Sequence, residues 1–474
     1  MIRSLFLCAS ILVFSLFSAG CKSSVKKSDA SSTARNVPFE IRPYETQKLP
    51  NGLTILWIQD NSLPYVAFQM MIKTGSSQDP AGKEGVAGFT ADLLDKGTAK
   101  RKATQISEDL EQIGSGFDVE VTPDYMVATA SSLSFSRESL LNQFREILLQ
   151  PTFPKEEMER QRKKLLAGIQ KMADRPEAFS DYLLTGFLYG RHPYGHSAMG
   201  VPKSVKSLKV DDLKAFYKTH FNPANAVLAV IGQMDETWKQ KVVQAFEGWE
   251  KRPAYASELP EFPNWKGVEL LLVDRSDLNQ AQIQIGFKGV PRNIPEYMQM
   301  RAALKVLGES FGSRLFDEIR VKRGLTYGIR SWFDPRAKSG PMGIYTFTRV
   351  EKVGETVEET LNTYRKFVKD GVTDEEVSVV KALMRGQFPR TFETPEGLAR
   401  QLLILNRYEV PVTYLTEFYK NLDKMDKASV NATVQKYFDP ENLRILVYAP
   451  RKGAEDSLKK MGRLEVKNYK EFLQ

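Results

Sequence analysis

Histidines are common zinc ligands and general bases near neutral pH, and this 474-residue chain contains three of them: His192, His196 and His220. The first two have the i, i+4 spacing of a helical zinc pair. However, Pro193 and Gly195 lie between them and predict a turn, in which this spacing no longer places both rings on one face. We interpret both residues as turn or packing residues, with metal ligation as the alternative. We expect His220, at the end of a predicted helix, to hydrogen-bond locally.

Other common catalytic patterns are missing from the sequence. It contains no G-x-S-x-G nucleophile elbow and no G-x-x-x-x-G-K-[ST] phosphate loop. The net charge of +9 comes from 67 basic and 58 acidic residues that are interleaved along the chain, and no nucleic-acid-binding signature accompanies it. A serine hydrolase, a P-loop enzyme and a nucleic-acid-binding protein are therefore not indicated.

The segment 82–98 (GKEGVAGFTADLLDKGT) predicts a short helix that follows a strand and a glycine-rich loop and ends at Gly97. Two of its residues are unusual for a helix that only packs in a core. Gly88 lies in the middle, where glycine costs about 1 kcal/mol relative to alanine. Asp92 lies four residues later, on the same face of the helix. We expect the function of this segment to depend on that face.

Residues 1–21 predict an export signal. Arg3 is followed by an apolar run at 5–16, too short to span a membrane as a mature helix, and then by small residues. The segment resembles a bacterial lipoprotein signal with Cys21 as the lipidated first residue of the mature chain. Ordinary secretion is the alternative, because Ser18 stands where such signals usually have leucine.

Residues 22–45 predict a flexible tether, since the part up to residue 36 is rich in Ser and Lys and has no aromatic residue. Cys8, the only other cysteine, would leave with the signal, so an acylated Cys21 leaves no thiol for a disulfide or a metal site. Lys22 after the cysteine resembles outer-membrane sorting. We expect a lipid-anchored protein of the cell envelope, at the outer membrane and facing the periplasm.

Two regions, 46–250 and 267–474, show the same order of predicted strands and helices. The segment 251–266 between them contains three prolines and no hydrophobic periodicity, which is typical of a linker. Predicted hairpins outnumber βαβ units in both regions. We therefore predict an α+β fold of two similar α/β domains with antiparallel or mixed sheets flanked by helices.

The two regions also share sequence. FNPAN followed by AVLAVIG begins at Phe221, and FDPEN followed by LRILVYAP begins at Phe438. AFQMMIKTG from Ala67 parallels AQIQIGFKG from Ala281. The two members of each pair are separated by nearly the same length of chain. Two blocks that recur at nearly one offset indicate a duplicated domain.

With these blocks in place, the chain resembles the insulinase/pitrilysin family of inverted zincins, especially the processing-peptidase-like branch with two-domain subunits. The likeness extends from about Lys48 to Pro450. The motifs that carry it are LPNGLTI at 49–55, TGSSQDPAGKEGVAGF at 74–89, LLDKGT at 93–98, HPYGHSAMG at 192–200 and GESFGSRLFDEIRVKRGLTYGIRS at 308–331.

The resemblance implies that this chain has lost its zinc site. Active members carry His-x-x-Glu-His on the first helix and a later Glu as third ligand. Here Gly88 and Asp92 stand at the two histidine positions, Ala91 at the general-base position and Gly168 at the third-ligand position. One carboxylate cannot hold a catalytic Zn²⁺. We therefore expect no catalytic residue, metal or cofactor in this chain, and zinc in a partner subunit.

The resemblance further implies a role in substrate binding. In the family, an Arg and a Tyr seven residues apart hold peptide near the metal of the catalytic subunit, and Arg320 and Tyr327 keep this spacing. The residues alone favour another interpretation, in which Arg320 is a solvated charge at a helix end and Tyr327 is a packing aromatic where a strand begins; the resemblance favours substrate binding. The resemblance also predicts that the segment 308–313 lines a peptide chamber and that a strand edge beside the first helix binds extended peptide.

These observations predict a non-catalytic, substrate-binding subunit of a heterodimeric zinc endopeptidase, paired with a zinc-binding subunit of the same family. One alternative is a homodimeric peptide-binding or envelope-assembly lipoprotein that acts without a peptidase partner. Another is an active peptidase with a rearranged metal site that uses Asp92 or His192.

Overall fold

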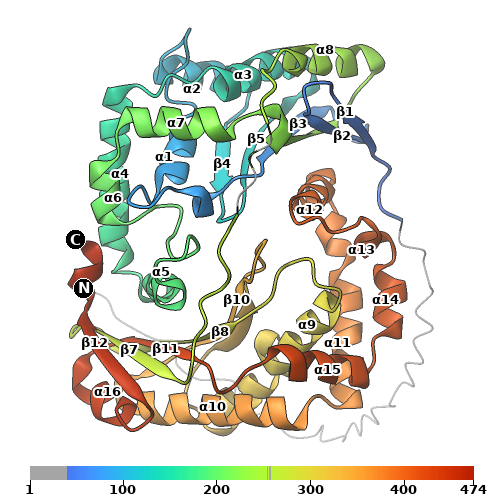
Figure 1. The fold of residues 1–474 in the computed structure, drawn as a ribbon. Coiled ribbons are helices and arrows are strands. Elements are labelled where there is room, and N and C mark those ends of the chain that lie inside the picture. Colours follow the sequence, from blue (N-terminus) through green and yellow to red (C-terminus); the bar gives the residue numbers. More distant parts are fainter. Residues whose placement is uncertain (1–39, 254, 256–257) are drawn as a thin grey trace, which may run out of the picture. The chain divides into compact units, whose positions relative to one another are not determined.

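Two six-stranded mixed sheets form the framework of the protein, which confirms the predicted α+β fold (Figure 1). The computed structural model describes residues 40–474 except 254, 256 and 257. The strand order is β1-β2-β6-β3-β5-β4 in the first sheet and β12-β7-β11-β8-β10-β9 in the second. The strands are β1 (Glu45–Lys48), β2 (Thr54–Gln59), β3 (Tyr65–Ile72), β4 (Asp118–Val121), β5 (Met126–Leu133), β6 (Ala226–Gly232), β7 (Glu269–Asp274), β8 (Gln280–Lys288), β9 (Ile329–Phe333), β10 (Pro341–Arg349), β11 (Arg444–Ala449) and β12 (Arg463–Asn468).

The two sheets repeat one topology over five strands. In the first, β6 pairs parallel with β2 and antiparallel with β3, and in the second, β11 pairs parallel with β7 and antiparallel with β8. Each sheet ends in a hairpin, β4–β5 or β9–β10, as the sequence predicts. The sixth strands differ, since β1 pairs antiparallel with β2 whereas β12 pairs parallel with β7. The predicted duplication is therefore visible in the order and direction of the strands.

Helices surround both sheets. Those of the first half are α1 (Val86–Asp92), α2 (Ala103–Gln112), α3 (Arg137–Leu149), α4 (Lys155–Met172), α5 (Pro176–Tyr189), α6 (Pro202–Ser207), α7 (Val210–His220) and α8 (Glu236–Glu247). Those of the second half are α9 (Tyr297–Leu304), the π-helical segments η4 (Lys305–Glu309) and η5 (Phe316–Lys322), α10 (Val353–Asp370), α11 (Asp374–Gln387), α12 (Pro395–Arg407), α13 (Thr413–Thr416), α14 (Phe418–Lys424), α15 (Lys427–Tyr437) and α16 (Arg451–Leu458).

Two helices at equivalent places in the repeat each pack on the sheet of the other half of the chain. Helix α5 starts with a proline, which suits the first helical position, and packs on β8 and β11 of the second sheet. Its Phe179 and Leu183 share one buried cluster with Val273 and Tyr448. Helix α12 also starts with a proline and packs on β6, β3 and β2 of the first sheet. Each sheet is thus completed by a helix from the other half of the chain.

The predicted signal at 1–21, Cys21 and the tether up to residue 39 lie outside the described residues. The predicted domain boundaries also stay a prediction, because residues Glu40–Gln474 form one compact unit. The described residues of the predicted linker at 251–266 form no helix or strand. Within the described part of the chain, every helix is too short or too polar to cross a bilayer.

Candidate functional site

Helix α1 is shorter than the sequence predicts. It covers Val86–Asp92, whereas the hydrophobic pattern and Gly97 predicted a helix across 82–98. After Asp92 the chain tightens into a turn, in which the N–H of Leu93 donates to Thr90 O and that of Leu94 to Ala91 O. Both leucines are fully buried. The apolar stripe therefore continues into a packed turn, which periodicity alone cannot distinguish from a helix.

A buried carboxylate fixes the start of α1. Asp79 accepts hydrogen bonds from the N–H of Gly85 (2.6 Å) and of Ala87 (2.9 Å). Burial raises the pKa of Asp79, and the Nδ1 atom of His196 lies 3.7 Å from its Oδ2 atom. Burial also lowers the pKa of His196. Both side chains thus help to hold the loop that leads into the helix.

Backbone closes the position where the family's first histidine would stand. A Cβ atom on Gly88 would lie 2.1 Å from the carbonyl oxygen of Ala198. Carbon and oxygen cannot approach so closely, so no side chain fits at Gly88 unless the loop at 192–200 moves. The glycine that costs helix stability is therefore required by close packing.

The other three zinc positions do not form a ligand set either. Ala91 is 3% exposed. Asp92 is exposed, and its Oδ2 atom accepts a 2.6 Å hydrogen bond from Gln161 on α4. Desolvation by the surrounding protein raises the pKa of Asp92. Gly168, on the same helix as Gln161, faces open space. These residues do not fit a zinc ion, and the described residues contain no group of three or more His, Cys, Asp or Glu side chains that could hold a metal.

The segment that contains the first two histidines is a turn, as Pro193 and Gly195 predict. His192 accepts a hydrogen bond from Tyr194 N at its Nδ1 atom, so its Nε2–H donates to Pro260 O, 3.0 Å away. This ring connects the turn to the 251–266 segment and is not directed at a metal.

His220 is buried between two aromatic rings. Its centroid lies 4.3 Å from that of Phe216 and 4.4 Å from that of Tyr255. Its Nδ1 atom lies 3.4 Å from the hydroxyl of Thr74, so the partner is 146 residues away and not local as predicted. Burial lowers its pKa to about 4.

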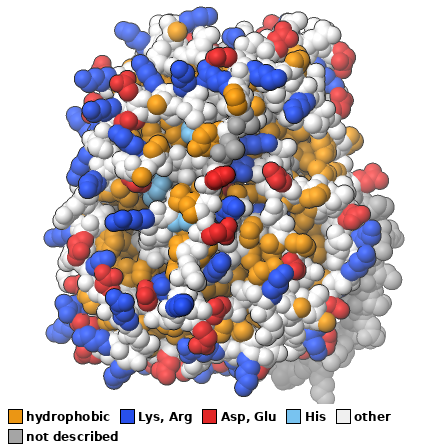
Figure 2. Space-filling model, viewed as in Figure 1, with side chains coloured by type: hydrophobic (Ala, Val, Ile, Leu, Met, Phe, Trp, Pro, Cys, Tyr) orange, Lys and Arg blue, Asp and Glu red, His pale blue; other side chains and the backbone are white. Residues whose placement is uncertain are grey.

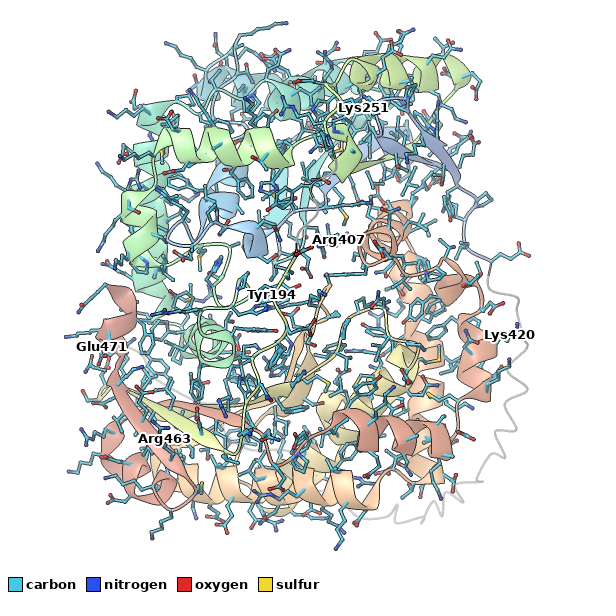
Figure 3. All side chains as sticks on the ribbon, viewed as in Figure 1. Tyr194, Lys251, Arg407, Lys420, Arg463 and Glu471 are labelled. Atoms are coloured by element: carbon cyan, nitrogen blue, oxygen red, sulfur yellow. The ribbon has the colours of Figure 1, made fainter. Side chains whose placement is uncertain are left out.

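Asp124, in the turn between β4 and β5, is the centre of a polar cluster that sequence reasoning missed. It is 1% exposed and accepts hydrogen bonds from the hydroxyls of Tyr194 (2.6 Å) and Tyr408 (3.2 Å) and from the N–H of Ala337 (2.7 Å). Its carbonyl oxygen accepts from Arg407 Nε, and Figure 3 shows Tyr194 and Arg407 directed toward the same central region. The cluster joins the first hairpin and the 192–200 loop to the second half.

Of the two residues predicted to bind substrate, Tyr327 is exposed and Arg320 is half-buried. Arg320 lies in η5, two residues before its end, and its guanidinium lies 4.6 Å from the ring centroid of Phe316. Tyr327 is 80% exposed and lies two residues before β9, not at its first residue. Within the described part of the chain, neither side chain has an ion pair or a hydrogen bond. Phe311, 84% exposed, lies in the adjacent 308–313 segment.

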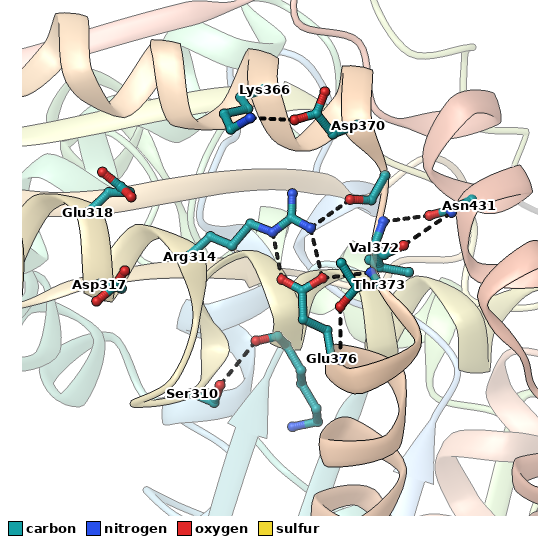
Figure 4. Close-up of polar contacts among 12 residues, drawn as sticks. Ser310, Arg314, Asp317, Glu318, Lys366, Asp370, Val372, Thr373, Glu376 and Asn431 are labelled. Carbon is teal, nitrogen blue, oxygen red and sulfur yellow. Dashed lines mark hydrogen bonds and ion pairs between the residues drawn. The ribbon is translucent and has the colours of Figure 1, made fainter.

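The backbone that carries Arg320 is firmly anchored (Figure 4). Arg314, shortly before η5, forms two parallel 2.7 Å bonds to Glu376 on α11 and a third 2.7 Å bond to Gly371 O. Glu376 also accepts from the N–H of Thr373, and Asn431 on α15 accepts from the N–H of Val372. The bidentate pair thus ties the start of this helix to two other helices.

The backbone before Tyr327 and β9 is fixed by threonines. Thr348 on β10 donates to Leu325 O (2.6 Å), and Thr346 donates to Gly328 O (3.0 Å). Thr326 donates to the same carbonyl and accepts from the N–H of Gly328. Tyr327 therefore projects into solvent from an ordered turn.

Strand β4 provides an accessible edge beside α1. Among the strands of the described residues, it pairs only with β5; its residues alternate between exposed and half-buried, and α1 packs against it. On the face shown in Figure 2, hydrophobic and histidine side chains are visible across the middle, and charged side chains are frequent around them. An unpaired edge of this kind can bind an extended peptide through backbone groups alone.

Comparison with protein families gives two matches. The family model described as Insulinase (Peptidase family M16) matches residues 54–200. The model described as Peptidase M16 inactive domain matches residues 207–384. The first match contains α1 and the lost zinc positions in α1 and α4, and the second contains Arg320 and Tyr327.

Individual relatives are similar over most of the chain. A Bacillus subtilis protein named uncharacterized zinc protease YmxG is 25% identical over 405 residues, which cover 84% of this chain and 96% of that protein. A Helicobacter pylori protein named non-peptidase homolog YmxG is 24% identical over 409 residues, 84% of this chain and 92% of that protein.

Two solved structures share the fold. The crystal structure of a peptidase M16 inactive domain from Pseudomonas fluorescens has a TM-score of 0.80 and 28% identity, and the match covers 86% of this chain and 98% of that one. The crystal structure of a Helicobacter pylori protease also has a TM-score of 0.80, with 18% identity and coverage of 87% and 100%.

Proposed function

Because the chain belongs to the insulinase family as a degenerate member, we propose that it is the non-catalytic, substrate-binding subunit of a two-chain zinc peptidase of the bacterial cell envelope. The observation that carries this proposal is the contrast between two sites in one chain. The zinc positions are closed or lack ligands at Gly88, Ala91 and Gly168, whereas Arg320 and Tyr327 extend uncommitted side chains from an anchored backbone.

Arg320 and Tyr327 supply hydrogen-bond donors for the substrate. The guanidinium of Arg320 offers a fork of N–H groups to a peptide carbonyl. The hydroxyl of Tyr327 donates to the oxygen on which negative charge develops when the peptide bond is attacked. A zinc ion bound in the partner subunit would activate the water that attacks the peptide bond. The edge of β4 holds extended peptide by strand addition, so sequences of many kinds can bind.

The location in the envelope is part of the proposal. Its support is the signal-like segment at 1–21, Cys21 at the expected lipidation position and the polar tether that follows. A lipid on Cys21 would hold the two-chain enzyme at the membrane surface, facing the periplasm.

Affinity copurification of the tagged full-length chain from the cell envelope tests the partnership. We expect a second insulinase-family chain with an intact His-x-x-Glu-His motif to copurify. Purification of the chain as a homodimer without any peptidase would contradict the proposal and favour the stand-alone peptide-binding alternative.

Peptidase assays of the reconstituted complex test the two residues. Arg320→Ala and Tyr327→Phe should each lower kcat/KM by about 10- to 100-fold, as expected for a lost charge-assisted or oxyanion hydrogen bond. Lys322→Ala is the matched control, because Lys322 is exposed on the same helix and pairs only with Asp317 and Glu318. Full activity of both variants would disprove the substrate-binding role.

A further inference from the structure

A cavity of about 540 Å³ lies in the second half of the chain, beside α9, α13, α14 and α15. Figure 1 shows these four helices gathered at the lower right. The lining contains two cationic residues, Arg292 and Lys424, and no Asp or Glu. A cavity of this size matches the sites that proteins use for small organic ligands.

Arg292 is 6% exposed and contacts two tyrosine rings. Its Cζ atom is 3.7 Å from the ring centroid of Tyr297 and 4.7 Å from that of Tyr414. In the described part of the chain, no carboxylate pairs with this guanidinium, and its polar side-chain neighbour is the Tyr414 hydroxyl. Burial raises the pKa of Tyr414 to about 12, so the phenol is neutral and does not balance the charge.

A buried guanidinium without an anion is costly. Isolated charges lose their hydration on burial, and cation–π contacts return about 0.5–2 kcal/mol each. The centroids of the two rings lie 6.0 Å apart and their planes are inclined at 73°, so the rings flank the guanidinium from two adjacent directions and do not enclose it. A planar carboxylate that reaches the guanidinium from the cavity can pair with it through two parallel hydrogen bonds.

The rest of the lining indicates what the carboxylate is attached to. Gln299 belongs to the lining, and none of the described residues donates a hydrogen bond to its buried Oε1 atom. A ligand N–H group that reaches this atom would satisfy it. Ile294, Met298 and Met425 supply an apolar wall. An aliphatic body with an amide N–H and a free carboxylate combines these features.

We propose that this cavity binds the free carboxylate end of a short apolar peptide or acylated amino acid, with the carboxylate on Arg292 and an amide N–H on Gln299. The site is separate in sequence and lining from Arg320 and Tyr327 and does not depend on the proposed peptidase partnership. It gives the chain a second way to recognise peptides, through their C-terminus and not through an internal carbonyl.

Calorimetric titration of the full-length chain without any partner tests this site. The probes are acetyl-Leu-Leu with a free carboxylate, the same compound as its amide, and inorganic phosphate. We expect the acid to bind at least about 10-fold more tightly than the amide, the ratio that one lost charge-assisted pair gives. Equal affinity of acid and amide, or tighter binding of phosphate, would overturn the proposal.

Variants locate the binding. Arg292→Lys should weaken the acid by about 10-fold or more because the fork is lost. Gln299→Leu should weaken it by about 3- to 10-fold and leaves the buried charge in place, so it decides the question if Arg292→Lys does not fold. Lys420→Gln is the control, since Lys420 lies on α14 outside the lining (Figure 3). Unchanged affinity in Gln299→Leu, or a loss in Lys420→Gln equal to that in Gln299→Leu, would contradict the assignment.

Discussion

Helix α1 and the η5–β9 segment carry the two sets of residues that the family resemblance singles out, and the two segments differ in structure. At α1, the carbonyl of Ala198 lies where the side chain of residue 88 would be, and the base position is buried. At η5–β9, an ion pair and threonine hydroxyls hold the backbone, while Tyr327 is exposed and Arg320 is half-buried.

This difference shows how a site can be lost or kept at the level of the backbone. Lost ligands alone could be restored by point substitution, but a loop packed on the empty position makes the loss structural. Conversely, the backbone that carries Arg320 and Tyr327 is ordered, although neither side chain has an ion pair or a hydrogen bond within the described residues. In the proposed function, the chain retains the half of the site that binds substrate.

Rebuilding the zinc ligands should have the largest effect. The combined substitutions Gly88→His, Ala91→Glu, Asp92→His and Gly168→Glu should destabilise the protein by about 5 kcal/mol, through overpacking at residue 88 and a buried carboxylate at residue 91. We expect less than one zinc per chain by atomic emission and a lower urea midpoint. Gly168→Glu alone, on an open surface, should be neutral. One tightly bound zinc in a stable variant would show that the α1 site is still open.

Asp124→Ala should lower the free energy of unfolding by about 3–4 kcal/mol, because two tyrosine hydroxyls and an N–H lose a buried acceptor. The effect should concentrate on the loop at 192–200, since Tyr194 is held by this carboxylate. Hydrogen exchange should show faster opening around α1 than around β9. Equal acceleration of exchange around α1 and β9 would mean that Asp124 does not stabilise the region of α1 more than that of β9.

Acid should weaken the α1 half specifically, because all three histidines of the chain lie in it. The pKa of His220 falls from about 6.5 in the unfolded chain to about 4 in the folded one. Its contribution to stability is therefore complete above pH 6.5 and is lost as the pH falls toward 4. At pH 4.5 this amounts to about 2 kcal/mol. Urea unfolding of wild type and His220→Phe at several pH values should show that difference, and parallel pH profiles would refute it.

Arg314→Met should have the smallest effect, about 1–2 kcal/mol, since the pair with Glu376 is partly solvated. The Arg314→Met variant also tests whether the anchoring of η5 matters for activity, because a loosened η5 should lower kcat/KM of the reconstituted complex. Lys366→Met, which breaks the exposed pair with Asp370 in Figure 4, should change neither quantity. Loss of stability without loss of activity would separate the anchor from Arg320.

Local patterns were enough to predict much of the fold. The hairpin β4–β5 and the repeat follow from alternation and two sequence blocks. Patterns within a segment do not report what it packs on. An apolar helix such as α5 reads the same whichever sheet it covers, so its position on the second sheet could not be predicted.

The candidate site shows the same limit. Arg320, Tyr327 and the missing ligands could be placed from spacing and family resemblance, whereas the reason for Gly88 is a carbonyl in a distant loop, at Ala198. Asp124 follows Thr122-Pro123 and is indistinguishable from an ordinary turn residue in the sequence. Its partners Tyr194 and Tyr408 are 70 and 284 residues away. Contacts at such separations require the folded chain.

The exchange of α5 and α12 between the sheets bears on how the protein is made. A ribosome that has finished the first sheet at Gly232 must continue to Pro395 before the helix that covers this sheet begins. Until then the growing chain exposes an apolar sheet face, a hazard for aggregation. A chain severed between residues 251 and 266 would leave two fragments, each lacking the helix that the other carries. We therefore expect the two halves to fold together, in one cooperative step late in synthesis.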